Sequence, residues 1–529
     1  MKKSLLLFLA AGLTFSTVHS QEMKDAMRYA QSELQGTARF TSMSGAFGAL
    51  GGDLSSININ PAGSAVFNNN QFATTMGNYD TKNESNYFGN NTSAGESTFD
   101  LNQAGGVFVF KTRNPNSALT KFSMAINYEN TNNYDNSMFS AGISPVNSVA
   151  NYFLSYANTG NNGAPVPLNY VTRQERESIT ELYNYLGSTL PNSQYPKLYG
   201  FDAQQAMLAY YEQGYIIDAE DLENPNSKYV SNVRPGGNYY QENSTYSSGY
   251  NGKLIFNSAV EIKDFIYIGV NLNSHFTDYV QDSNFYESNN NPLDLNYKVK
   301  NLNFSNSLHT YGSGFSFQIG TIAKLTKEIR VGLAYESPTW YNLRDEFSQR
   351  LSSVSSNSTN TLSPDIADPN VINYYAPYDL QTPGSLTASF AYVFGKTGLL
   401  SVDYKYKDYS CTEFSPENDP VFRTQNSIMQ NSLGSSNEIR VGGEYRIQNL
   451  KLRGGYRFEG SPYNDSVTIG DLNSFSGGLG YSFGAIKLDL SYVHAHTTAQ
   501  EQFFSQGFTQ RANINTYKNN FTMTFTFEM

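Results

Sequence analysis

Positively charged side chains recur at alternate positions of two neighbouring segments near the C-terminal end of the chain. Arg440 and Arg446 lie on the first segment, and Arg453 and Arg457 lie on the second. An Arg guanidinium binds a carboxylate through two parallel hydrogen bonds, so these four residues are a candidate anion site. A structural role competes with this interpretation, because acidic residues such as Glu444 are available to pair with these cations.

Other residues able to do chemistry are too scattered to form a site. His494 and His496 project from one face of a single segment, and the mature chain has only two further histidines, so we expect no metal site. Cys411 is the single cysteine and forms no internal disulfide. Ser491 and Asp489 lie on the opposite face from His494, which does not fit a hydrolase. We therefore predict no catalytic residues and no cofactor.

The segments that carry these residues alternate between apolar and polar side chains with a period of two. Examples are residues 400–407, 439–446, 450–458 and 521–529. This period predicts β-strands with one apolar face and one polar face. Such strands occur in soluble β-sandwiches and in membrane barrels, and in a barrel the apolar face contacts lipid while the polar face lines the lumen.

The connections between the predicted strands favour the barrel. Tight turns are predicted at 263–264, 396–398, 448–449 and 484–485, and long loops at about 280–308, 346–382, 411–435 and 499–517. Short turns at one end and long loops at the other are typical of an outer-membrane barrel with an even number of antiparallel strands. We predict an all-β membrane protein of about fourteen strands: 70–79, 101–111, 121–131, 252–262, 265–279, 309–323, 329–345, 383–394, 399–410, 436–447, 450–460, 471–483, 486–498 and 518–529.

Composition and targeting signals agree with this class. Residues 1–20 contain two lysines and then an apolar run, which predicts a signal peptide and a mature chain that begins at Gln21. The chain has 40 Tyr, 35 Phe and a net charge of −11. This charge argues against a nucleic-acid partner. We expect export to the outer membrane of a Gram-negative bacterium, with 70–529 forming the barrel.

One predicted loop, 132–250, is much longer than the rest and has helical signals. It is expected to be extracellular. Its apolar residues at helical spacing are the candidate ligand-binding residues, although packing within the loop is an alternative explanation. These candidates are Ile179, Leu182, Tyr183, Leu186, Phe201, Met207, Leu208 and Tyr211.

A glycine-rich stretch, 36–67, precedes the first predicted strand and fits neither a helix nor a strand period. A barrel of fourteen strands is wide enough to leak, so the segment 21–69 is predicted to fold inside it as a plug. Residues 42–50, followed by Asp53 and by Asn60-Pro61-Ala62-Gly63, resemble the N-terminal hatch of the FadL/TodX outer-membrane transporters. Members of this family carry long-chain fatty acids or aromatic hydrocarbons. The resemblance implies hatch or gate roles for Gly45, Gly48, Asp53, Asn60, Pro61, Ala62 and Gly63.

The resemblance also implies a mechanism. A hydrophobic molecule is captured on the extracellular loops, enters the plugged barrel passively, and leaves after a hatch movement, with a lateral route into the membrane. The expected partners are this small molecule and outer-membrane lipid, and the expected state is a monomer. The chain departs from the family in ending Phe527-Glu528-Met529 rather than in Phe. The alternative function is a structural or adhesive barrel that binds a surface partner through its large loop.

Overall fold

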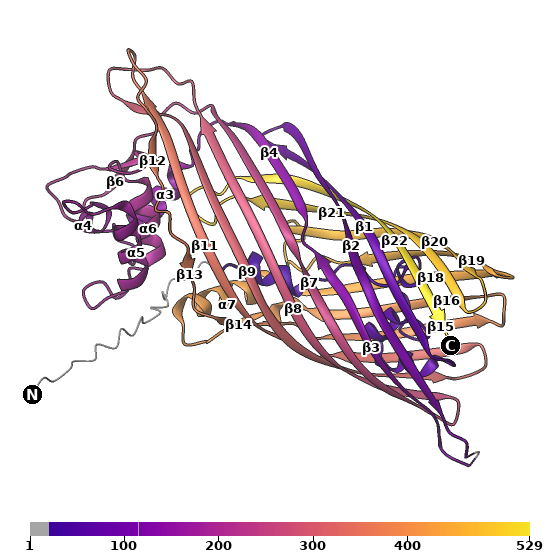
Figure 1. The fold of residues 1–529 in the computed structure, drawn as a ribbon. Helices are drawn as coiled ribbons and strands as arrows, with labels where there is room; N and C mark the ends of the chain where they lie inside the picture. Colours follow the sequence, from indigo (N-terminus) through magenta and orange to yellow (C-terminus); the bar gives the residue numbers. More distant parts are fainter. Residues whose placement is uncertain (1–20, 115) are drawn as a thin grey trace, which may run out of the picture.

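The computed structural model of the protein describes residues 21–114 and 116–529, so the predicted signal peptide lies outside the described residues. Twenty strand segments form one antiparallel sheet, which closes because β1 (Gln71–Tyr87) pairs with both β2 (Asn90–Lys111) and β22 (Arg511–Glu528). Several strands are interrupted, and the segments therefore make fourteen passes. The predicted fourteen-stranded barrel is confirmed (Figure 1).

The other passes follow one another around the barrel in chain order. They are β3 with β4 (Leu119–Asn133, Asn136–Ser144), β7 (Tyr239–Ile262), β8 (Ile266–Ser288), β9 (Lys298–Lys324), β10 with β11 (Ile329–Glu336, Thr339–Ser356), β12 to β15 (Asp365–Ala367, Asn373–Tyr374, Tyr378–Thr382, Ser385–Phe394), β16 with β17 (Gly398–Asp408, Glu413–Ser415), β18 (Ser435–Ile447), β19 (Leu450–Glu459), β20 (Ile469–Ser482) and β21 (Ile486–Gln502).

The two faces of the wall follow the predicted alternation. On β22, Phe521, Phe525 and Phe527 are exposed on the outside, whereas Thr522 and Thr524 are buried inside. The outward aromatic and aliphatic side chains form the band that faces lipid, and the inward polar ones line the lumen. Within the described part of the chain, no helix is both long enough and apolar enough to cross a membrane.

The four predicted tight turns connect β7 to β8, β15 to β16, β18 to β19 and β20 to β21. The strands at the opposite end are longer than the sequence predicted. β1 and β2 form one long hairpin with Phe88 and Gly89 at its turn, whereas strands ending at 79 and restarting at 101 were expected. Residues 80–86 and 89–98 have no large apolar side chain, so this extension has no apolar period to reveal it. The predicted loops 280–308, 346–382 and 499–517 are likewise shorter than expected, because the flanking strands extend into them.

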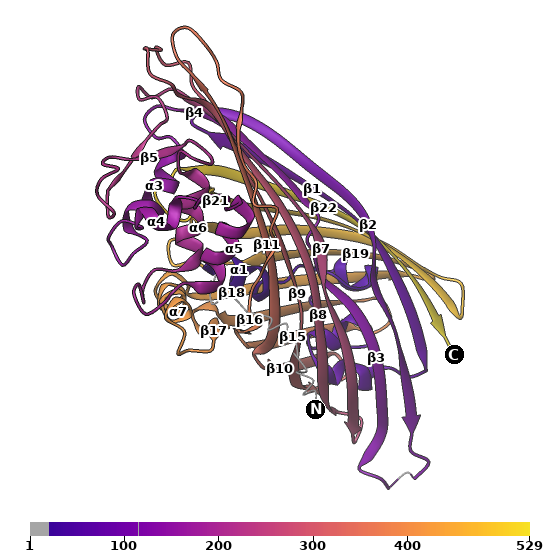
Figure 2. The same cartoon turned by 60° about the vertical axis from the view of Figure 1, so that its left-hand side comes forward.

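The segment 132–250 also begins and ends in strand, because β4 and the first half of β7 occupy its two ends. Between them, residues 145–238 form the unit that we call the helical domain, which stands beside the upper end of the barrel (Figure 2). Its elements are α3 (Ala150–Thr159), α4 (Leu168–Val171), α5 (Ile179–Thr189), α6 (Gly200–Ala209) and the small hairpin β5 (Ile217–Ala219) with β6 (Tyr229–Ser231). The start of α5 is fixed by a reciprocal capping box between Ser178 and Glu181.

The N-terminal segment lies inside the barrel (Figure 1). Its first element is α1 (Met23–Ala30), and residues 36–67 contain only short turns of helix, α2 (Ala38–Thr41), η1 (Ser55–Asn58) and η2 (Pro61–Val66). We call residues 36–67 the hatch. Near the upper rim, η3 (Tyr409–Cys411) interrupts the ninth pass between β16 and β17, and α7 (Pro420–Ser432) connects the ninth pass to the tenth. This helix packs on α1 through Phe422 and Met429.

Candidate functional site

The hatch contacts the barrel wall where the wall has glycine. Six inward-facing glycines on β8, β9, β10, β18, β19 and β20 lie so close to the hatch that an added Cβ would approach hatch atoms to under 3.0 Å. We call this set the glycine belt: Gly269, Gly320, Gly332, Gly442, Gly455 and Gly478. A side chain at any of these positions would displace atoms of the hatch, so the belt sets the height at which the hatch sits.

Hydrogen bonds from wall side chains to hatch backbone hold the hatch in this position. The Asp403 carboxylate accepts from the backbone N–H groups of Phe47 and Gly48, both at 3.0 Å. Asn257 donates to the Pro61 carbonyl at 2.9 Å, and Asn271 donates to the Ile57 carbonyl at 2.9 Å. The wall therefore supplies the partners that an irregular buried segment needs for its backbone.

Asn60 connects the two halves of the hatch to each other and to the wall. Its side-chain oxygen accepts from the Ala62 N–H at 3.1 Å and caps η2, whose first residue is Pro61. Its amide nitrogen donates to the Gly48 carbonyl at 2.7 Å and to the Thr321 carbonyl of β9 at 3.0 Å. Replacement by a shorter side chain would break all three contacts at once.

The remaining predicted hatch residues have local roles. Gly45 has a φ of 75°, which favours glycine. Gly63 packs against the Gly51 backbone, where neither position has room for a Cβ. Asp53 accepts from the Thr37 hydroxyl at 2.7 Å and from the Ser55 N–H at 3.0 Å, so it organises the interior of the hatch.

The four candidate lumen arginines line the inside of β18 and β19 and are each paired with carboxylates. Arg440 bonds Glu438, and Arg457 bonds both Glu438 and Glu459. The second group is centred on Glu444, whose partners are Arg39 of the hatch, Arg446 and Arg453, and Arg453 also bonds Asp489. Neighbouring carboxylates thus neutralise the charge of these arginines. This arrangement matches the structural role given above as the alternative to an anion-binding site.

Three cavities lie inside the lumen. The upper cavity, about 180 Å³, lies between the helical domain and α1 and has aromatic walls. The large cavity, about 390 Å³, lies between residues 31–34 and the wall of β19 to β22. The polar cavity, about 90 Å³, lies between residues 29–35 and the hatch residues Phe40, Asn58 and Ile59. The last two cavities share Gln31, Ser32, Glu33 and Leu34 as a partition.

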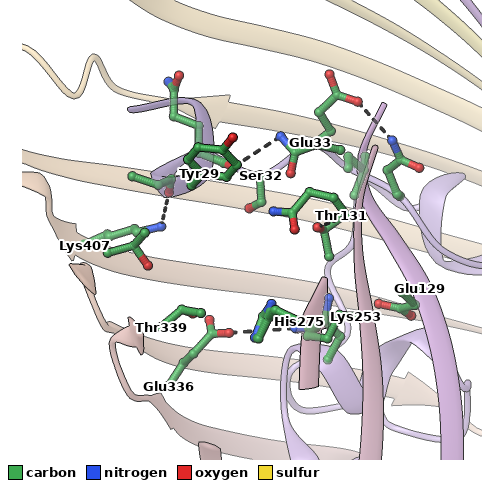
Figure 3. A pocket seen from close by; sticks show the side chains of 18 of the residues that line it. Tyr29, Ser32, Glu33, Glu129, Thr131, Lys253, His275, Glu336, Thr339 and Lys407 are labelled. Atoms are coloured by element: carbon green, nitrogen blue, oxygen red, sulfur yellow. Dashed lines mark hydrogen bonds and ion pairs between the residues drawn. The ribbon is translucent and has the colours of Figure 1, made fainter. Parts of the chain in front are cut away.

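The polar cavity is rich in lysine (Figure 3). Lys407 donates to the Ala30 carbonyl at the C-terminal end of α1, at 2.5 Å. Glu336 lies 3.8 Å from the Lys253 ammonium and 3.9 Å from that of Lys405. In Figure 3, Lys253, His275 and Glu336 lie together on one side of the cavity, and Tyr29 and Lys407 lie above them.

More of the surface of the large cavity is apolar than polar. Leu472, Val493 and Ala495 contribute from the wall, and Leu34 contributes from the partition. Charged residues also line it, among them Lys518, which pairs with Glu33. Apolar surface combined with polar groups is the usual form of a small-molecule site.

The structure places the ligand-binding candidates of the large loop in different surroundings. Leu182, Tyr183, Leu186, Met207 and Leu208 are buried in the core of the helical domain, which fits the alternative explanation, packing within the loop. Ile179 packs at the edge of this core, and Tyr211 is exposed on the surface. Phe201 is the candidate that lines a cavity, the upper one.

The aromatic wall of the upper cavity comes mainly from residues that the sequence did not single out. Phe504 lies 4.7 Å from Tyr152 and 5.0 Å from Phe285, measured between ring centroids. The sequence offered one signal for this wall, the adjacent pair Phe503-Phe504 in a loop between two polar strand ends. Nearby on α6, burial raises the pKa of Asp202 to about 7.

The histidines predicted to bind no metal lie on the outside of β21. His494 contacts the Asn519 amide at 2.9 Å, and His496 stacks on Tyr517 with 4.7 Å between ring centroids. Among residues 21–114 and 116–529, no group of three His, Cys, Asp or Glu side chains is arranged to hold a metal ion.

A closed fourteen-pass barrel with an internal hatch defines the class of outer-membrane channels. Residues 255–527, slightly more than half of the chain, match the model of a family described as outer membrane protein transport protein (OMPP1/FadL/TodX). The chain belongs to this family, and the resemblance predicted from the sequence is confirmed. The family and the fold are those of transport channels rather than enzymes.

Solved structures share the fold over nearly the whole chain. A FadL homologue from Pseudomonas aeruginosa has 11% identity and a TM-score of 0.55, with 94% of this chain and 99% of that chain covered. The toluene transporter TodX from P. putida has 13% identity and a TM-score of 0.50 at the same coverage. A search of curated proteins by sequence gave no match.

Proposed function

We propose that the protein is a monomeric, passive channel that takes up hydrophobic small molecules across the outer membrane of a Gram-negative bacterium. The observation that carries this proposal is the order of the cavities. An aromatic chamber under the helical domain is followed by a larger chamber in the lumen whose walls carry both apolar and polar groups, and the hatch closes the barrel below. Apolar surfaces favour the transfer of a hydrophobic molecule out of water. This uptake needs no energy input as long as the molecule is consumed downstream.

The cargo classes that suit the large cavity are long-chain fatty acids and aromatic hydrocarbons. Leu472 and Val493 offer apolar contact, and the Lys518–Glu33 pair at the edge offers a polar contact to a head group. Release requires the hatch to leave the glycine belt, and the Asn60-Pro61 corner is the hinge of this movement. The cargo then passes either into the membrane or into the periplasm. The hatch residues Gly45, Gly48, Asp53, Asn60, Pro61, Ala62 and Gly63 are proposed to act in this step.

An uptake assay with a filled cavity tests this function. Val493→Trp places an indole in the large cavity, because Val493 is buried and faces the lumen. Tyr492→Trp is the matched control, because Tyr492 is the adjacent residue on the outside of the same strand. In cells that lack their own transporter, oleate and toluene uptake should rise with the wild type and with Tyr492→Trp and fall with Val493→Trp. Equal uptake with and without the wild-type protein would overturn the proposed function.

A further inference from the structure

The lipid-facing wall has a hollow on the outside of β2, β3, β7 and β8, four strands that lie side by side (Figure 1). We call it the outer groove, and its volume is about 360 Å³. All of its outward lining residues except the serine are exposed apolar side chains, so the groove is open to the membrane. These residues are Phe108, Phe110, Met124, Ile126, Phe256, Ser258, Val270 and Leu272.

Ser258 is the reason for the hollow. Its directly paired neighbours are Met124 on β3 and Val270 on β8, and Phe256 follows on the same face of β7. These larger side chains project past the short side chain of Ser258, so the surface sinks between them. A large side chain at this one position would therefore fill the groove.

Aromatic contacts hold the side of the groove formed by β2 and β3. Phe110 stacks on Phe122 with 6.1 Å between ring centroids, and Phe108 makes a T-shaped contact with Phe72 at 5.6 Å. Gly106 leaves room for the Phe72 ring, which a Cβ there would approach to 2.6 Å. Because these rings are held by their own contacts, the groove is formed before any ligand arrives.

The groove lies in the part of the wall that is nearer the tight turns, and these turns face the periplasm in outer-membrane barrels. Ser258 is four residues from Ile262, the last residue of β7. In a tilted strand this spacing places it about 10 Å above the turn. The apolar band of such a barrel is about 25 Å tall, so the groove faces the acyl chains of the inner leaflet.

Cations stand at the periplasmic end of the groove. Lys263 is exposed in the turn between β7 and β8, and the Lys263 backbone N–H donates to the Ala118 carbonyl of the neighbouring β2–β3 turn at 2.9 Å. Lys111 and Arg113 are exposed on the other arm of that turn. Among the described residues 111–114, 116–118 and 263–265, Asp264 is the one acid. This end is thus locally positive in a chain whose net charge is −11.

We propose that the outer groove binds one anionic phospholipid of the inner leaflet. An acyl chain lies between the apolar walls, and the phosphate contacts Arg113 and Lys263 at the membrane boundary. This ligand is not the cargo, because it stays on the lipid side of the wall and does not enter the lumen. The inference goes beyond the proposed function and does not depend on it.

Native mass spectrometry tests the site. The full mature protein in a nonionic detergent is mixed with phosphatidylglycerol or with phosphatidylcholine that carries the same acyl chains, and the retained lipid is counted. Ser258→Trp fills the groove. The matched control is Ala388→Trp, because Ala388 is also a small, exposed, lipid-facing residue, paired with Leu333 and Tyr404.

The wild type should retain one phosphatidylglycerol and several-fold less phosphatidylcholine. Ser258→Trp should lose the retained lipid, whereas Ala388→Trp should behave as the wild type. A double variant, Arg113→Gln with Lys263→Gln, should lower the retention of phosphatidylglycerol to that of phosphatidylcholine. Its control is Lys396→Gln, which removes an exposed cation from the turn between β15 and β16 and should change nothing.

Equal retention of the two lipids by the wild type would overturn the proposal, and so would wild-type retention of phosphatidylglycerol by Ser258→Trp. An equal loss in Ser258→Trp and Ala388→Trp would reveal ordinary lipid contact around the barrel and would also overturn it. The charge variants leave the wall intact, so they decide the question even if Ser258→Trp does not fold. Unchanged preference for phosphatidylglycerol in the double variant would contradict the site.

Discussion

The hatch and the helical domain both cover the lumen, but different forces hold them in place. The hatch rests on the glycine belt, and wall side chains such as Asp403 and Asn257 bond its backbone. The helical domain packs around an apolar core centred on Tyr183, Leu186 and Met207, which continues onto residues of the upper barrel wall such as Phe285 and Phe304. The wall therefore positions the hatch, whereas apolar packing supports the helical domain. A substitution in one region should leave the other in place.

The largest stability effect is expected in the core of the helical domain. Leu186→Ala removes a fully buried side chain, and such changes cost about 2–5 kcal/mol. Limited proteolysis should then cut residues 145–238 faster, while the barrel stays closed to ions. Ile179→Ala, on the same helix but only partly buried, is the control. An ion leak in Leu186→Ala would contradict the independence of the two regions.

The next effect concerns the glycine belt. Gly455→Leu drives a side chain into the hatch backbone at Met43 and Ser44, and overpacking of this kind costs about 1–3 kcal/mol. Single-channel conductance should rise because the hatch leaves its seat. Gly454→Leu is the matched control, since Gly454 has open space beside it on the adjacent position of the same strand. Identical conductance of the two variants would show that the belt does not hold the hatch.

A smaller effect is expected at Asn60. Asn60→Ala removes the cap of η2 and the bonds to Gly48 and Thr321, and loss of a cap alone costs about 0.5–2 kcal/mol. Amide hydrogen exchange should accelerate in residues 48–66 and remain unchanged in the helical domain. Asn60→Asp keeps the capping oxygen and loses the donor, so its exchange should be intermediate. Wild-type exchange rates in Asn60→Ala would refute the role of this corner.

The last effect is a pH dependence of the helical domain. Burial raises the pKa of Asp202 to about 7, so the folded domain binds a proton more tightly than the unfolded chain does. Its stability should therefore fall as the pH rises from about 4 to about 7 and then level off. Asp202→Asn should flatten this dependence in proteolysis measured across that range. A stability that rises over the same interval would contradict the assignment.

The sequence was informative where one face of a strand contacts lipid. Alternation in residues 521–529 predicted β22, and the short turns predicted the closed barrel. It failed for residues 80–100, because a strand above the membrane is polar on both faces. Helical spacing found Leu182 and Leu186 but does not say what covers them, and they are core residues. The cavities could not be predicted, because each is built from segments far apart in the chain, such as residues 31–34 and β19 to β22.

The most direct test of the account is to map where a hydrophobic cargo contacts the protein. A fatty acid that carries a photoreactive diazirine is added to membranes containing the wild-type protein, and labelled peptides are identified by mass spectrometry. The account predicts labels at the cavity residues Phe201, Phe504, Leu472 and Val493, in addition to the lipid-facing Phe475 and Phe521. Unlabelled cargo in excess should remove the cavity labels first. Labelling confined to lipid-facing residues would contradict passage through the lumen.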